Sequence, residues 1–139
     1  MYRFLLVILL GVTLLTGGCG GGDSNRQAPF MVNADGVSTF DLNQLRSQLN
    51  TFPIGSLTAL EEEGLLMMRE EEKLAHDVYT TLYAQHGLAI FSNIASSELT
   101  HTEAVLALLE RYQLTDPVTN NAVGSFSNSE FTYLYTVLT

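Results

Sequence analysis

Glu98 and His101 are the pair of residues in this sequence that is best suited to chemistry. They are three residues apart, and on an α-helix this spacing places two side chains on one face, about 60° apart around the axis. The other residues at helical spacing around them are apolar, namely Phe91, Ile94, Val105, Leu108 and Tyr112. Burying a carboxylate and an imidazole in such a stripe costs free energy unless they are paired, neutral or bound to a metal. The pair is therefore a candidate for metal binding.

Glu72 repeats this pattern on the preceding segment. It lies in a second stripe at helical spacing, with Leu65, Met68, Ala75, Tyr79 and Leu82. If the two segments are helices that turn back near Gly87, Glu72 and residue 102 are both fifteen residues from the turn and lie opposite one another. A Glu on one helix that faces a Glu-x-x-His motif on the next is the arrangement of carboxylate-bridged metal sites in helical bundles. We therefore predict that Glu72, Glu98 and His101 are metal ligands.

Other interpretations of these three residues stay open. A buried Glu–His ion pair could fix the register of two helices without a metal, or the stripe could face solvent. Among the neighbouring residues, we expect Glu70 and Glu71 on a solvated face, His76 at the surface, and Met67 and Met68 in the core. The sequence shows no Ser/His/Asp set, no glycine-rich phosphate loop and no Cys/His zinc spacing.

Helix-capping signals place the predicted ligands on two long helices. Thr58 and Glu61 form a capping box, which is typical of a helix start. Gly87 suits the left-handed position that ends many helices. We expect helices over about 59–86 and 89–112, and the short turn between them makes the pair an antiparallel hairpin.

Two shorter helices are expected on either side of this pair. A second capping box at residues 127–130, with Ser127 as its first residue, predicts a short helix from about 128. Asp41 could cap another short helix over 40–49. Two long amphipathic helices with such fragments leave an apolar face that needs covering.

The composition excludes some classes of function. The chain has 139 residues, enough for one domain at most, and it carries 15 Asp and Glu against 6 Lys and Arg. This acidic balance argues against binding to nucleic acid, which requires a basic patch. Cys19 is the single cysteine, so the chain holds no internal disulfide.

The N-terminal residues are typical of an export signal. Residues 1–18 contain Arg3 and an apolar run over 4–15, which is shorter than the roughly 20 residues that span a bilayer. Small residues at 16–18 then precede Cys19, as in a bacterial lipobox, which implies lipidation of Cys19 and an exported protein anchored to the cell envelope. The anchor would lie at the outer membrane or the periplasmic face where the host has one. A cleaved signal that leaves a free thiol, and a cytoplasmic chain with an apolar head, stay open.

The remaining residues divide into a tether and a folded domain. We expect residues 19–56 to be a flexible tether that includes the short helix, because residues 20–38 are rich in Gly, Ser, Asn and Asp and show little periodicity. The folded domain is expected over residues 57–139.

Two segments carry a more specific pattern than spacing alone. They are residues 68–75 (MREEEKLA) with 77–79 (DVY), and residues 90–95 (IFSNIA) with Ser97, Glu98, His101 and 104–112. This pattern resembles the bacterial ferritin-like family of unknown function 2202. Glu72, Ala75 and Tyr79 also resemble the first ligand helix of rubrerythrin-like proteins, while His76 stands where Arg is usual in the family. The resemblance covers about 57–139 and implies an all-α fold, a ferritin-like helical bundle that is truncated here to its first long helix pair and a short helix.

The resemblance implies iron as the cofactor, in a di-iron site whose first half is Glu72, Glu98 and His101, with Mn or Zn as other candidates. In the family, a second helix pair supplies another Glu and another Glu-x-x-His. We expect a homodimer to complete the site by two-fold symmetry. Only in that dimer do we expect an enzyme that oxidises Fe(II) with oxygen or peroxide. The alternatives are a non-catalytic helical interaction module, and a truncated, inactive fragment of a ferritin-like protein.

Overall fold

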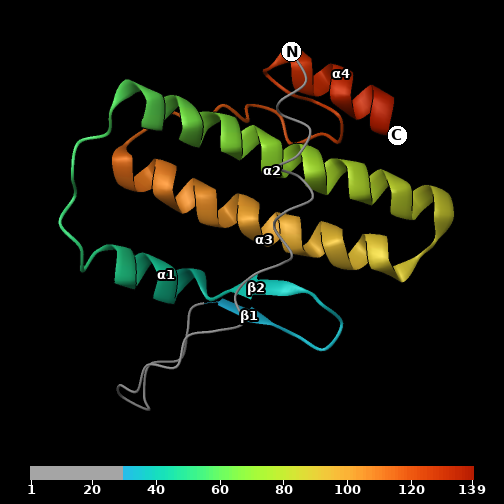
Figure 1. Ribbon diagram of the computed structural model, residues 1–139, viewed down its shortest axis with the longest axis horizontal. Coiled ribbons are helices and arrows are strands. Elements are labelled where there is room, and N and C mark those ends of the chain that lie inside the picture. Colours follow the sequence, from blue (N-terminus) through green and yellow to red (C-terminus); the bar gives the residue numbers. More distant parts are fainter. Residues whose placement is uncertain (1–29) are drawn as a thin grey trace.

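Two long antiparallel helices form the centre of the fold (Figure 1). They are α2 (Ala59–His86) and α3 (Ala89–Tyr112), at the bounds that the capping signals predict. The computed structural model describes residues 30–139, so the predicted signal peptide and the predicted lipidation of Cys19 lie outside the described residues. Within that range, no helix is both long and apolar enough to cross a membrane.

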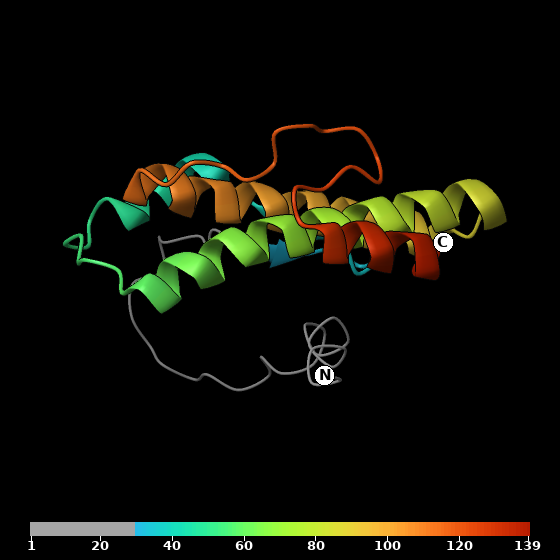
Figure 2. The same cartoon turned by 90° about the horizontal axis from the view of Figure 1, so that it is seen from above.

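The smaller elements pack on both sides of this pair (Figure 1). α1 (Leu42–Leu49) and a hairpin of β1 (Phe30–Val32) and β2 (Ser38–Phe40) lie against α3, and α4 (Ser129–Leu138) lies against α2. Seen from above, the loop after α3 runs back along the helix pair before α4 begins (Figure 2). The predicted all-α class is confirmed, since the sheet in the described residues consists of two strands of 3 residues each.

Local capping interactions explain where α2 begins and ends. Thr58 Oγ1 accepts a hydrogen bond from the Glu61 N–H (3.3 Å), and Glu61 Oε2 accepts one from the Thr58 N–H (2.8 Å), as the capping box predicts. Gly87 has a φ of 67°, and its N–H donates to the Tyr83 carbonyl. An N-terminal cap of this kind stabilises a helix by about 1 kcal/mol, and the left-handed glycine lets α3 begin at Ala89.

The caps of the short helices match the sequence in one case and differ in the other. α1 begins after Asp41, whose side chain accepts a hydrogen bond from the Gln44 N–H, as predicted. α4 begins after Asn128, so the prediction of Ser127 as its cap is wrong by one position. The Ser127 hydroxyl instead donates to the Pro117 carbonyl (2.6 Å), which fastens the loop to itself.

The β-hairpin was not expected from the sequence, which places these residues in the flexible tether. Asn33 accepts hydrogen bonds from two backbone N–H groups of the turn, and Gly36 reverses the chain with a φ of 79°. A strand of three residues is too short to show the alternation that identifies strands. Contacts with α3 stabilise the hairpin, because two strands alone are marginal in water.

The apolar core is small and lies mainly between α2 and α3. Its buried members are Leu74, Ala75, Val78, Ala95, Val105, Ala107 and Leu109. Leu74 and Leu109 are almost completely buried, and each such side chain contributes about 1.5–3 kcal/mol of hydrophobic stabilisation. The alanines allow close approach of the neighbouring elements.

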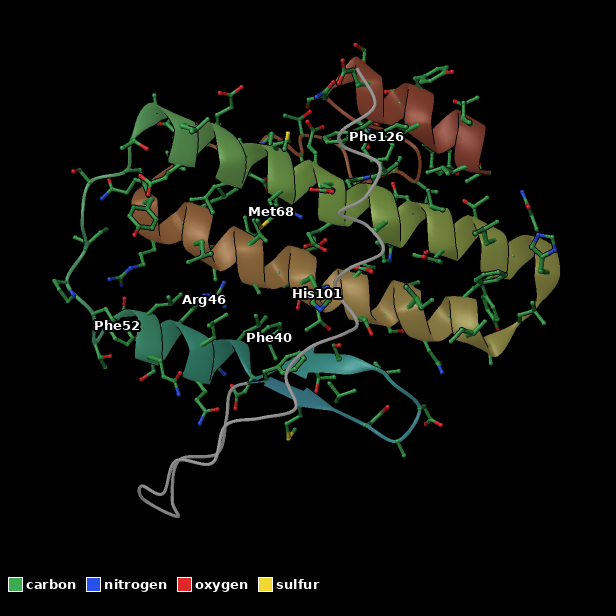
Figure 3. The ribbon with its side chains drawn as sticks, in the orientation of Figure 1. Phe40, Arg46, Phe52, Met68, His101 and Phe126 are labelled. Atoms are coloured by element: carbon green, nitrogen blue, oxygen red, sulfur yellow. The ribbon has the colours of Figure 1, made fainter. Side chains whose placement is uncertain are left out.

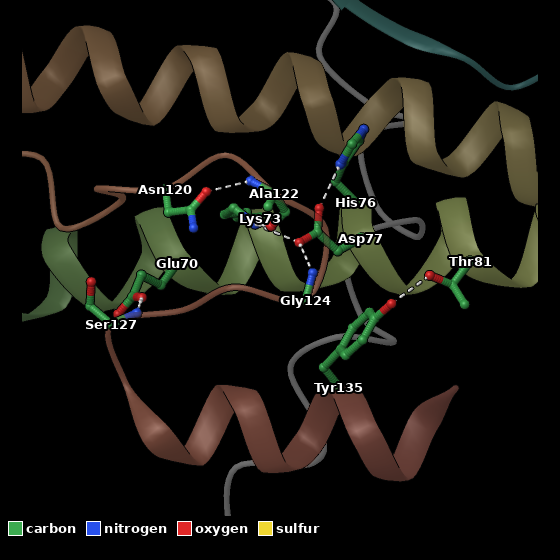
Figure 4. A network of polar contacts seen from close by, with 10 residues as sticks. All are labelled: Glu70, Lys73, His76, Asp77, Thr81, Asn120, Ala122, Gly124, Ser127 and Tyr135. Carbon is green, nitrogen blue, oxygen red and sulfur yellow. Dashed lines mark hydrogen bonds and ion pairs between the residues drawn. The ribbon is translucent and has the colours of Figure 1, made fainter.

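Charged residues of α2 are buried against the loop that follows α3 (Figure 4). Asp77 Oδ2 accepts hydrogen bonds from Lys73 Nζ and from the Gly124 N–H (2.9 Å). Glu70 Oε1 accepts the backbone N–H of Ser127, just before α4. The prediction that Glu70 lies on a solvated face is therefore wrong: the residue is 5% exposed, because the loop covers that face.

Other side chains near the predicted ligands also differ from expectation. Met67 and Met68 are 41% and 43% exposed, so they do not fill the core that residues 30–139 form, and this prediction is wrong. Glu71 and His76 are partly buried rather than fully solvated, and His76 Nδ1 lies 3.1 Å from Asp77 Oδ1. The two methionines are therefore only partly covered, and Met67 lines a pocket together with Pro117 and Asn128 of the loop after α3.

Candidate metal centre

The structure brings the three predicted ligands together. Glu72 comes from α2, while Glu98 and His101 come from α3, and one ligand atom from each lies within 4.8 Å of the others. His101 Nδ1 is 3.0 Å from Glu98 Oε2 and 3.6 Å from Glu72 Oε2. Figure 3 shows His101 near the middle of the helix pair.

Helix geometry and the register of the hairpin explain this convergence. Glu98 and His101 share a face of α3 because they are three residues apart. Glu72 lies at their level because the turn at Gly87 sets the register of α2 against α3. The sequence predicts both features, since neither requires contacts beyond the hairpin.

The electrostatics of the cluster favour a cation. Burial raises the pKa of the Glu72 carboxyl above its ordinary value, although the ion pair with His101 opposes this shift. Burial also raises the pKa of Glu71, and the nearby negative charges of Glu72 and Glu98 add to the shift. Three carboxyl groups therefore lie close together, and a positive charge among them relieves their repulsion.

The protonated ring of His101, an imidazolium, supplies this positive charge. The ion pair with Glu72 and the hydrogen bond with Glu98 raise the pKa of His101 to about 9, more than burial lowers it. At neutral pH the protonated ring thus bridges two carboxylates. A metal ion would displace this proton, because histidine binds metals as the neutral imidazole.

The donor set suits a transition metal. Two carboxylates and one imidazole nitrogen are ligands that iron, manganese and zinc accept. The side chains of His101, Glu72 and Glu98 remain 33%, 24% and 19% exposed, so the cluster is open on one side. A metal held here would keep coordination positions for water or for further ligands from outside the cluster.

One wall of the cluster is formed by an aromatic residue that the spacing of the ligands does not predict. The ring of Phe40, on β2, meets the His101 ring edge to face, with 6.3 Å between the ring centroids. The Ser38 N–H donates to Ser97 Oγ (2.9 Å), which fastens β2 to α3 beside Glu98. The signal that could have found this wall is the Asn-Ala-Asp-Gly turn at residues 33–36, between the two short apolar segments.

Comparison with known proteins gives a family but no activity. The uncharacterized protein MJ0754 of Methanocaldococcus jannaschii is 53% identical over 87 residues, which cover 63% of this chain and 47% of that protein. The crystal structure of hypothetical protein MJ0754 from Methanococcus jannaschii DSM 2661 matches with a TM-score of 0.61 and 53% identity, over 62% of this chain and 49% of that chain. The chain therefore spans about half the length of this relative.

A family model also matches the C-terminal part of the chain. It is described as "Uncharacterized protein domain (DUF2202)" and matches residues 61–139, which include α2 from its third residue, α3, α4 and all three candidate ligands. This is more than half of the sequence, and the resemblance to family 2202 is confirmed at this level. The chain belongs to the DUF2202 family of uncharacterized protein domains.

Proposed function

We propose that this protein is a ferritin-like metal-binding protein that holds iron through Glu72, Glu98 and His101. The observation that carries the proposal is the convergence of these three side chains on one open face of the α2–α3 hairpin. In ferritin-like bundles, a Glu from one helix and a Glu-x-x-His motif from the next form half of a di-iron site. The spacing and the pairing of helices here fit that half-site.

The other half of the site comes from a second copy of the chain in this proposal. A di-iron centre of this type uses about six protein ligands from four helices, and the cluster supplies three. Two-fold symmetry would place an identical hairpin opposite the first, with the same three ligands facing inward. The exposure of the ligands and of Met68 supports a contact on this face.

Each residue has a separate task in this site. Glu72 and Glu98 would balance the charge of the cation, and His101 would offer Nδ1 once its proton has left. Bound iron would supply electron transfer to oxygen or peroxide. Glu71 would add negative charge at the edge of the cluster, which favours a divalent metal ion over the singly charged imidazolium. Export and a lipid anchor at Cys19 stay predictions from the sequence alone.

A second candidate function rests on the ion pairs themselves. His101 already lies between two carboxylates at 3.0 and 3.6 Å, an arrangement that fixes the register of α2 and α3 without metal. In that case the protein is a non-catalytic interaction module whose open face docks a partner protein.

Anaerobic titration with Fe(II), followed by calorimetry, separates the two candidates. We expect binding in the natural protein and a loss of more than tenfold in affinity for Glu98→Gln and His101→Ala. Glu103→Gln is the matched control, because Glu103 is an exposed carboxylate on the same helix outside the cluster. No heat of binding in the natural protein would favour the interaction module.

A further inference from the structure

The β-hairpin places an aromatic ring against one of the proposed ligands. Phe40 and His101 have ring centroids 6.3 Å apart and an interplanar angle of 72°, which is an edge-to-face contact. Phe30 supports Phe40 from the neighbouring strand, with 5.1 Å between their ring centroids. Figure 3 shows Phe40 on the hairpin side of His101. The imidazole is thus confined between an apolar ring and the two carboxylates that face its Nδ1.

Two hydrogen bonds hold the hairpin in this place. The Ser38 N–H donates to Ser97 Oγ (2.9 Å), and the Asn93 side chain donates to the Asp35 carbonyl (3.2 Å). Ser97 is buried and directly precedes Glu98, and its hydroxyl also donates to the Asn93 carbonyl. The hairpin is therefore fixed to the turn of α3 that carries two of the proposed ligands.

We propose that Phe40 is a positioning residue for the metal centre, which holds the His101 imidazole with Nδ1 directed at Glu72 and Glu98. The inference rests on the proposed metal role of these residues. A ligand that is already held in its binding rotamer loses less conformational freedom when the metal binds. Without the Phe40 ring, His101 would gain other rotamers on the open side of the cluster.

This device lies outside the residues that match the family. The family model covers residues 61–139, whereas the hairpin lies within 30–40. The N-terminal segment of this chain therefore does more than connect the domain to its surroundings: it forms a wall of the site. A substitution there is expected to change metal binding although it changes no ligand.

Fe(II) titration of the full chain under anaerobic conditions tests this role. Phe40→Ala should weaken Fe(II) binding about tenfold, the lower range for partners that orient metal ligands. Phe40→Tyr keeps the aromatic ring, so its affinity for Fe(II) should stay within about twofold of the natural value. That change is small beside the roughly tenfold loss expected for Phe40→Ala. Ser97→Ala, which removes the anchor of β2, should weaken binding in the same direction. Phe52→Ala is the control, because this aromatic residue is 67% exposed and lies at the far end of α1 from His101 (Figure 3).

A second readout needs no metal. The ring current of Phe40 shifts the NMR signals of the His101 ring protons, so Phe40→Ala should move these signals and Phe52→Ala should leave them unchanged. If Fe(II) binds to the natural protein and equally well to folded Phe40→Ala, the inference is overturned and the proposed function stands. If the natural protein binds no Fe(II), the proposed function fails and the positioning role for a metal fails with it, while the ring signals still report whether Phe40 contacts His101. A lower melting temperature with unchanged affinity would assign Phe40 a structural role only.

Discussion

At the scale of residues, the candidate site consists of Glu72, Glu98 and His101, with one ligand atom from each within 4.8 Å of the others. Glu98 and His101 share a helix face, and Glu72 reaches them through the register of one short turn, so each step depends on nearby sequence. The contact of Phe40 with His101 could not be predicted in this way. It joins residues 61 positions apart (101 less 40) through a hairpin whose strands are too short to show a pattern.

The ion pairs of His101 predict a pH dependence of the metal-free protein. The pKa of His101 is raised from 6.5 to about 9 in the folded state, so the folded state binds more protons than the unfolded state between these values. The stabilisation is then fully present below pH 6.5 and is lost as the pH rises through about 9. Urea unfolding between pH 6 and pH 10, values chosen to bracket the pKa range, should show this decline.

The variant His101→Gln provides the comparison for this measurement. It keeps a polar side chain but cannot titrate, so its stability should change less over the same pH range. Since the His101 side chain is 33% exposed, solvent screens the ion pairs and the difference should be about 1 kcal/mol or less. An equal loss of stability in both proteins would show that other groups cause it.

At the scale of elements, the long helices could be predicted and the packing of the loop could not. The capping box at Thr58 and the left-handed Gly87 are local signals, and both are present in the structure. The burial of Glu70 depends on contacts with a segment 57 residues further along the chain, and no local pattern marks it. The sequence therefore assigns this face of α2 to solvent, whereas the loop after α3 covers it.

Two glycines should respond in opposite ways to substitution by alanine. Gly124 has a φ of 78°, and a Cβ there would lie 2.7 Å from the Tyr135 ring, so Gly124→Ala should destabilise the protein by about 1–3 kcal/mol. Gly64 lies inside α2, where a Cβ meets nothing within 4 Å, so Gly64→Ala should stabilise it by about 0.5–1 kcal/mol. Denaturant unfolding measures both, and a stable Gly124→Ala would mean that the loop does not pack on α4 as described.

The buried ion pair of α2 should matter far more than a surface pair. Asp77→Asn leaves the Lys73 ammonium buried without its counter-charge and should cost about 3–5 kcal/mol. Glu110→Gln breaks the pair with Arg46 at 2.9 Å, but those side chains are 42% and 53% exposed, so this change should cost less than about 1 kcal/mol. Similar losses in the two variants would contradict the burial of Asp77.

At the scale of the whole molecule, the structure is an α-helical hairpin with a small core and an open face that carries the candidate ligands. The sequence predicts the all-α class and both long helices, and the structure confirms them. The ferritin-like assignment, the metal and the dimer are proposals that rest on the convergence of Glu72, Glu98 and His101. The sequence does not predict which surfaces of two copies would be in contact, because no local sequence pattern marks such surfaces.

Metal binding should stabilise the whole molecule. A ligand that binds only the folded state at about 100 times its dissociation constant adds about 2.7 kcal/mol, which corresponds to a rise in melting temperature on the order of 10 °C. Anaerobic Fe(II) should therefore raise the melting temperature, and a chelator should reverse the effect. His101→Ala should show neither change, and an equal rise in that variant would place the metal elsewhere.

We propose that Glu72, Glu98 and His101 form half of an iron site that a second copy of the chain completes. Native mass spectrometry of the purified protein, titrated anaerobically with Fe(II), is the decisive measurement because it reports the oligomeric state and the metal content together. We expect a dimer that carries two iron ions and that disappears in His101→Ala. A monomer that remains free of iron at saturating Fe(II) would contradict it.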